Sequence, residues 1–253
     1  MAPGTCVAFA PTQADRHQVV FIDAGHGGYA PGASGTRSDG RPVLEKNLTL
    51  AIALRARDLL RAEGFTAVMS RTTDTTVARM SASDISGGTM TVAGDHDDIA
   101  ARVACANSAS AALLLNLHFN ASADTGAAGT QTFYDDARRF SAENARLAQR
   151  IQSAVVASLH TAGMNTPDRG TLPDSQSGSP ALTPLGAQYN HYLELGPVYP
   201  NLVYEASGMP GVIAEMLFVS NPREADIASS PLGQQALARG IARGATDYLG
   251  QRA

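Results

Sequence analysis

The sequence has little of several features that would define its class directly. Among its 253 residues there is no Trp, there are only 2 Cys, and 17% of the residues are charged. No apolar run reaches the roughly 20 residues of a membrane-spanning helix, so we expect no integral membrane segment. The formal net charge is −4, so the surplus of Lys and Arg that phosphate binding needs is missing, and we expect no nucleic acid partner. The absence of Trp removes one residue that stacks on sugars but excludes no ligand.

The N-terminal residues are predicted to form a tail over residues 1–18, ahead of a domain over residues 19–250. Residues 1–15 are small and polar, without the basic start and apolar middle of a secretory signal, so no export signal is visible. Cys6 lies in this tail, and Cys105 lies in the apolar stretch 99–106. A disulfide between them and a simply buried Cys105 thiol both remain open, and we favour the buried thiol.

Apolar runs alternate with amphipathic segments along the domain. The apolar runs predict strands at residues 19–22, 65–71, 113–117, 130–134 and 212–216. The amphipathic segments predict helices at residues 45–63, 97–110, 141–162 and 231–248. Ser141 is the expected N-cap of its helix. Residues 72–94 and 166–200 are rich in small and polar residues and are expected to be loops. The alternation predicts a single α/β domain, with a mostly parallel (mixed), twisted sheet of about six strands and helices on both faces.

Polar residues stand at or near the ends of three predicted strands: His26, His118 and Glu215. Sites in such sheets form beyond the carboxyl ends of strands. A hydrolytic zinc ion is held by His nitrogens and carboxylate oxygens, with one position left open. His26, Glu45 and His118 are therefore candidate ligands. Their wide spacing matches no local motif, so each could instead be structural, and Glu45 could simply complement a helix dipole.

Four sequence blocks then occur in order: DAGHGG at 23–28, EKNL at 45–48, LHFNA at 117–121 and EMLFVSNP at 215–222. Together they resemble the zinc-dependent N-acetylmuramoyl-L-alanine amidases, the type 3 amidase family of cell-wall hydrolases. The resemblance extends from about Val19 to Leu249, nearly the whole chain. Relative to that family, residues 75–95 and 171–198 look like insertions. A nucleotide site at the glycine-rich residues 25–35 is not favoured, because the G-x-G-x-x-G and Walker patterns are missing.

The resemblance implies that His26, Glu45 and His118 bind one Zn²⁺ and that Glu215 is the catalytic general base and acid. The implied substrate is peptidoglycan, cut at the amide bond between N-acetylmuramic acid and L-alanine. It also implies an extracytoplasmic location (periplasm, cell wall or secreted), and we expect a monomer. Two alternatives stay open: a zinc hydrolase of another amide, such as a peptidase or deacylase, and a catalytically silent peptidoglycan-binding module.

For several other polar residues the sequence leaves alternative roles open. Asp23 and Asn120 could accept the second N–H of a metal-bound imidazole, or could satisfy loop backbone. His191 and Glu194 could line a substrate groove, or Glu194 could reach in and block the metal, but a solvated loop is the simplest interpretation. The same alternatives apply to Glu205. The remaining histidines are expected on the surface or in loops: His17, His96 and His160.

Overall fold

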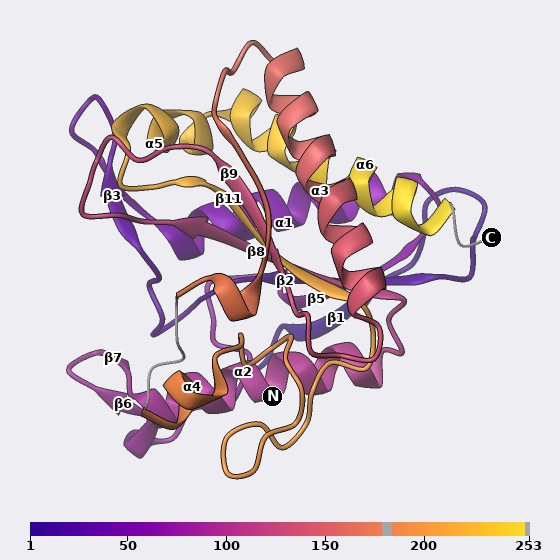
Figure 1. Ribbon diagram of the computed structural model, residues 1–253, viewed down its shortest axis with the longest axis vertical. Coiled ribbons are helices and arrows are strands. Elements are labelled where there is room, and N and C mark those ends of the chain that lie inside the picture. Colours follow the sequence, from indigo (N-terminus) through magenta and orange to yellow (C-terminus); the bar gives the residue numbers. More distant parts are fainter. Residues whose placement is uncertain (179–183, 251–253) are drawn as a thin grey trace.

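A mixed sheet of seven strands forms the centre of the molecule, in the spatial order β1-β5-β2-β8-β11-β9-β10 (Figure 1). The structure is a computed structural model that describes residues 1–178 and 184–250. The four central strands run parallel to one another: β5, β2, β8 and β11. β1 pairs antiparallel with β5, β9 pairs antiparallel with β11, and β10 runs parallel to β9. The strands are β1 Thr5–Phe9, β2 Val19–Ala24, β5 Thr66–Arg71, β8 Leu113–Asn120, β9 Thr130–Tyr134, β10 Asp168–Pro173 and β11 Gly211–Phe218.

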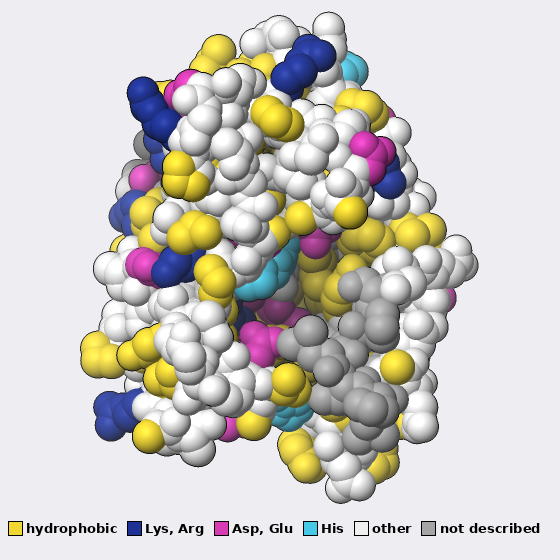
Figure 2. All heavy atoms as spheres, turned by 90° about the vertical axis from the view of Figure 1, so that its left-hand side faces the viewer, with side chains coloured by type: hydrophobic (Ala, Val, Ile, Leu, Met, Phe, Trp, Pro, Cys, Tyr) yellow, Lys and Arg dark blue, Asp and Glu magenta, His cyan; other side chains and the backbone are white. Residues whose placement is uncertain are grey.

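Two small antiparallel hairpins stand apart from this sheet, β3 (Ser34–Thr36) with β4 (Pro42–Leu44), and β6 (Ile85–Ser86) with β7 (Thr89–Met90). β3, β6 and β7 lie on the left of Figure 1, the side that faces the viewer in Figure 2. On that side the surface is hollowed, and histidine and acidic side chains gather in the hollow (Figure 2). β3, β6 and β7 therefore lie on the same side of the molecule as this hollow.

Helices cover both faces of the sheet. The helices are α1 Glu45–Ala62, α2 Val92–Ser108, α3 Ser141–Thr161, α4 Pro184–Tyr189, α5 Pro222–Ser229 and α6 Pro231–Gly250, with short 3-10 turns η1 Ala82–Asp84 and η2 Asp174–Gln176. One face carries α1, α3 and α6, and α2 packs on the other. Over residues 1–178 and 184–250, no helix combines the length and the hydropathy that crossing a membrane requires.

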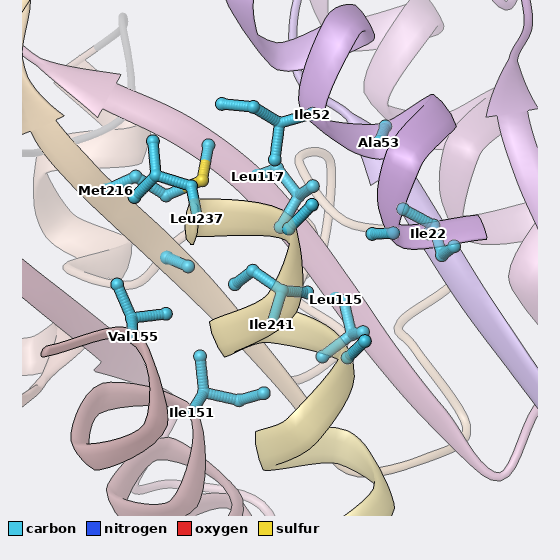
Figure 3. Close-up of a cluster of buried hydrophobic side chains, with 14 of the residues drawn as sticks. Ile22, Ile52, Ala53, Leu115, Leu117, Ile151, Val155, Met216, Leu237 and Ile241 are labelled. Atoms are coloured by element: carbon cyan, nitrogen blue, oxygen red, sulfur yellow. The ribbon is translucent and has the colours of Figure 1, made fainter. Parts of the chain in front are cut away.

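The two faces follow from the period-two alternation of strand side chains. Leu115 and Leu117 of β8 join Ile52, Ile151 and Ile241 of the helices in the larger core (Figure 3). The alternate residues of β8 point to the opposite face, where Leu114 packs in a smaller core with residues of α2. The predicted single α/β domain, with a mixed sheet and helices on both faces, is thus confirmed. The sheet has seven strands rather than about six. The five strands located in the sequence are all present, and the other two are the edge strands β1 and β10.

The first missed edge strand lies within the predicted N-terminal tail. β1 pairs antiparallel with β5, with Cys6 inside it. Cys6 forms a disulfide with Cys105 of α2, with the two Cα atoms 5.6 Å apart. The expectation of a free Cys105 thiol was therefore wrong. The short, partly exposed strand has no strong apolar pattern, and its pairing depends on a partner more than fifty residues away in the chain, at Thr66–Arg71.

The second missed strand, β10, lies in the range 166–200 that was expected to be a loop, together with η2 and α4.

The bounds of several elements also differ from those predicted from the sequence. Helix α2 begins at Val92, because the side chain of Thr91 accepts a hydrogen bond from the Gly94 N–H. Ser141 is the first residue of α3 rather than its N-cap, which is Phe140. The range 75–95 contains η1, β6 and β7.

Candidate metal centre

Four polar side chains meet at one end of the sheet, each from a different element. His26 lies in the loop after β2, Glu45 is the first residue of α1, His118 lies within β8 and Glu215 within β11. His118 was expected just past its strand, but β8 extends to Asn120. His118 and Glu215 are register partners on parallel strands. Neighbouring strands lie about 4.8 Å apart, so the sheet itself sets their separation.

His26, Glu45 and His118 present ligand atoms to one point. Nε2 of His26 lies 3.2 Å from Oε2 of Glu45, and Nδ1 of His118 lies 3.0 Å from Oε1 of the same carboxylate. One ligand atom from each of the three residues lies within 4.8 Å of the others. In a tetrahedral site with bonds of about 2.0–2.1 Å, neighbouring ligand atoms are about 3.3 Å apart. The cluster therefore fits one metal ion of this size.

The Glu45 carboxylate is fixed by backbone donors. Oε2 accepts the N–H of Ala33 at 2.7 Å, and Oε1 accepts the N–H of Phe119 at 2.8 Å. Glu45 is only 2% exposed. It lies at the N-terminus of α1, where the helix dipole favours a negative charge. Burial by itself raises the pKa of Glu45, but the hydrogen bonds to His118 and His26 outweigh it and hold the pKa well below its usual range. Glu45 is therefore an ionised, oriented acceptor between two imidazoles.

Two glycines leave the space in which the cluster forms. A Cβ atom on Gly25 would lie 2.4 Å from Nε2 of His118 and 2.7 Å from the Leu117 carbonyl oxygen. A Cβ atom on Gly32 would lie 2.6 Å from Cδ2 of His26 and 2.7 Å from Oε2 of Glu45, and the φ of Gly32 is +68°. Any larger residue at either position would displace a candidate ligand, so both glycines belong to the geometry of the cluster.

Glu215 stands beside the cluster without joining it. Its Oε2 atom is shielded from solvent and has no hydrogen-bond partner among the described residues. Burial and the nearby charge of Glu45 raise the pKa of Glu215 to about 8, against the opposing effect of His26. A carboxyl group with a free oxygen and a raised pKa, next to a candidate metal site, can accept a proton and release it again.

The loop that carries His26 is held by Arg102, a residue to which the sequence assigned no role. Its guanidinium donates to Asp23, Asp98, and the carbonyl oxygens of Ala24 and His26. Asp23, expected as a possible partner of a metal-bound imidazole, is the counter-ion of Arg102 at 2.6 Å. The sequence did contain a sign of this role, because Arg102 lies in an apolar helical stretch and a buried guanidinium needs a buried partner.

Asn120 takes the other role considered for it. Its side-chain oxygen accepts the N–H of Ala121 at 2.8 Å, so it satisfies turn backbone. Glu205 is exposed and accepts a hydrogen bond from Asn107, away from the cluster. His17 and His160 are exposed, as predicted. His96 differs from the prediction, because it is partly buried on α2 and its ring is hydrogen-bonded to the carbonyl of Leu202.

A cavity of about 200 Å³ opens beside His26, His118 and Glu215, in the hollow that Figure 2 shows. One face of α2 forms one wall, and a segment of the 171–198 range, residues 191–194, forms another. Asn116 and Ile213, one alternation below His118 and Glu215 on their strands, line the cavity as well. The cavity therefore leaves room for a substrate group directly against the candidate metal ligands.

The solvated-loop interpretation of His191 and Glu194 was wrong. Glu194 is only 4% exposed, lines the cavity and accepts a hydrogen bond from the side chain of Asn116. Burial and the charge of Asp23 raise the pKa of Glu194 well above its usual range. It does not belong to the cluster of candidate metal ligands. The side chain of His191 is 15% exposed and contacts Asp174. Both His191 and Glu194 line the cavity, which agrees with the alternative that they line a substrate groove.

Comparisons with known proteins give matches over nearly the whole chain. A family model described as N-acetylmuramoyl-L-alanine amidase matches residues 20–247. The germination-specific N-acetylmuramoyl-L-alanine amidase of Bacillus subtilis (strain 168) is 27% identical over 235 residues, 93% of this chain and 81% of that protein. The crystal structure of an N-acetylmuramoyl-L-alanine amidase from Clostridium difficile 630 is 26% identical with a TM-score of 0.64, and the match covers 93% of this chain and 98% of the other.

A further solved structure, the CwlD amidase from Clostridioides difficile in complex with the GerS lipoprotein, is 22% identical. It has a TM-score of 0.67 over 93% of this chain and 100% of the other, which shows a shared fold. Since the family model spans nearly the entire domain and includes all four side chains of the centre, this chain belongs to the type 3 family of N-acetylmuramoyl-L-alanine amidases.

Proposed function

We propose that this protein is a zinc-dependent peptidoglycan hydrolase that cuts the amide bond between N-acetylmuramic acid and L-alanine. The observation that carries the proposal is the meeting of His26, Glu45 and His118, within 4.8 Å of one another, beside Glu215 on the next strand. His26, Glu45 and His118 would hold one Zn²⁺. When bound, the ion supplies Lewis acidity that polarises an amide carbonyl and lowers the pKa of a water molecule.

Glu215 would move the proton that amide hydrolysis requires. Its free Oε2 takes a proton from the attacking water and delivers it to the L-alanine nitrogen as the C–N bond breaks. An amine is a poor leaving group unless it is protonated, so this delivery matters as much as the initial abstraction. The register pairing with His118 fixes the position of the carboxyl group relative to the candidate metal ligands.

The other residues would orient the site. The backbone N–H groups of Ala33 and Phe119 hold the Glu45 carboxylate in place, so its remaining lone pairs point towards the imidazoles. Arg102 fixes the His26 loop through the carbonyl oxygens of Ala24 and His26. Such supporting contacts change metal affinity about 10–100-fold in other metal sites.

Purified peptidoglycan sacculi test the proposal. The zinc-loaded protein should release stem peptides with free L-alanine amino termini and leave intact glycan strands, and a chelator should abolish the release. Glu215→Gln should keep its zinc content but lose about 10²–10⁴-fold in rate. Glu205→Gln is the matched control, because it removes an exposed carboxylate and should retain full activity.

Three outcomes would contradict the proposal in different ways. Binding to sacculi without any product would indicate a silent binding module. Release of products cut at a different amide would indicate another zinc hydrolase. Near-normal activity of Glu215→Gln would remove Glu215 from the reaction.

We also propose that the protein works outside the cytoplasmic membrane, where peptidoglycan lies, and as a monomer. The Cys6–Cys105 disulfide supports this location, because disulfides persist mainly in oxidising compartments. Mass analysis of the protein isolated from its native compartment, with thiol alkylation, tests whether the two cysteines are oxidised there. Light scattering of the purified chain tests the monomer.

A further inference from the structure

A second cluster of potential metal ligands lies away from the candidate catalytic centre: Asp135, Asp174 and His191. Asp135 directly follows β9, and Asp174 directly follows β10. These strands are parallel, and their last residues, Tyr134 and Pro173, are register partners. The two carboxylates are therefore brought side by side at the carboxyl ends of β9 and β10, which lie near the amino end of the antiparallel neighbour β11. His191 reaches them from the segment that follows α4.

Each carboxylate uses one oxygen for the backbone and turns the other towards His191. Oδ1 of Asp135 accepts the N–H groups of Ala137 and Arg138, and Oδ2 of Asp174 accepts the N–H of Tyr192. The remaining oxygens, Oδ2 of Asp135 and Oδ1 of Asp174, lie 3.2 Å and 2.9 Å from Nδ1 of His191. Both Asp side chains are 0% exposed.

The cluster has more acceptors than donors. Nδ1 of His191 carries at most one hydrogen, and Asp174 holds the shorter contact to it. Oδ2 of the buried Asp135 accepts no hydrogen bond from any described residue. The nearby Arg138 guanidinium does not supply one, because it donates to Leu195, Gly196 and Ser207. A buried carboxylate oxygen without a donor is costly unless a cation binds it.

The charges and distances favour a divalent ion. When both are ionised, the two carboxylates give the cluster two negative charges, and Asp136 adds a further carboxylate 4.0 Å from Nδ1 of His191. The contacts of 2.9 Å and 3.2 Å resemble those of the candidate catalytic cluster, at 3.0 Å and 3.2 Å. One imidazole nitrogen with two carboxylate oxygens is a donor set for zinc and related divalent transition metals.

We propose that Asp135, Asp174 and His191 bind a second divalent transition-metal ion, of the zinc type, at a structural site separate from the catalytic centre. The ion would join the ends of β9 and β10 to residues 191–194, which form a wall of the cavity. Glu194 lies three positions after His191, so the second ion would hold this wall in place against the sheet. Its role is to position the wall, and it takes no part in the hydrolysis.

Metal counting tests the proposal without reference to activity. The full chain is loaded with Zn²⁺, dialysed against metal-free buffer and analysed by mass spectrometry for zinc per chain. We expect two zinc ions in the wild type, one in Asp174→Asn, one in His191→Gln and one in His118→Ala. The double variant His118→Ala/Asp174→Asn should hold none. His160→Gln, which removes an exposed histidine, is the matched control and should keep two.

Each result decides the matter. A wild-type chain with one zinc ion, all of it lost in His118→Ala, overturns the proposal even if Asp174→Asn fails to fold. A second ion that survives in both Asp174→Asn and His191→Gln also overturns it. Failure of the proposed amidase function leaves the count at this site unchanged, because His118→Ala reports the second ion alone.

Discussion

Arg102 gives the sharpest test of how the fold holds the candidate metal centre. All five N–H groups of its guanidinium have acceptors, at 2.6 Å to Asp23, 2.8 Å and 3.0 Å to Asp98, 3.0 Å to the Ala24 carbonyl and 2.7 Å to the His26 carbonyl. The substitution Arg102→Met keeps most of the side-chain length and removes the charge. It leaves Asp23 and Asp98, 0% and 2% exposed, as buried carboxylates without their cation.

The expected loss of stability is large. Removing one partner of a buried charge pair costs about 3–5 kcal/mol. For a domain of this size, each kcal/mol lowers Tm by about 2–4 °C, so Tm should fall by about 6–20 °C. Because the His26 carbonyl also loses its donor, zinc affinity of the folded variant should fall about 10–100-fold.

Urea unfolding and competition with a chromogenic chelator measure the two effects separately. Arg243→Met is the matched control, since Arg243 is an exposed helix residue that pairs with Asp247 on the same helix, and its loss should change stability by less than about 0.5 kcal/mol. If Arg102→Met unfolds within about 1 kcal/mol of the wild type and binds zinc equally well, the network does not hold the His26 loop as argued.

Three further predictions follow from the same structure. Replacing Cys6 and Cys105 by Ser opens a loop whose ends are 99 residues apart, which should destabilise the domain by about 2–5 kcal/mol in urea unfolding; an unchanged midpoint would contradict this. Gly25→Ala places a Cβ atom 2.4 Å from Nε2 of His118, so zinc affinity should fall at least about tenfold while circular dichroism stays native; equal affinity would show that the loop yields freely. Ile241→Ala, at 0% exposure, should cost about 2–5 kcal/mol, whereas Leu232→Ala, at 59% exposure, should cost less than about 0.5 kcal/mol in the same assay.

The sequence by itself determined the fold class and the identity of the residues in the candidate centre. Strand and helix periodicities are local, so the apolar run at 113–117 and the amphipathic pattern at 45–63 were visible without the structure. The ordered blocks around His26, Glu45, His118 and Glu215 indicated the family for the same reason, because each block is contiguous.

Only the tertiary structure decided which distant segments meet. The pairing of β1 with β5, the disulfide and the burial of Glu194 against Asn116 all join segments far apart in the chain. The placement of Glu215 beside His118 depends on the register of β11 against β8. If β11 were shifted by one residue against β8, the side chains of Glu215 and His118 would lie on opposite faces of the sheet, and no local sequence pattern determines that register. Composition described residues 166–200 as a loop, but burial against the sheet made part of that range a wall of the cavity and placed His191 beside two buried carboxylates.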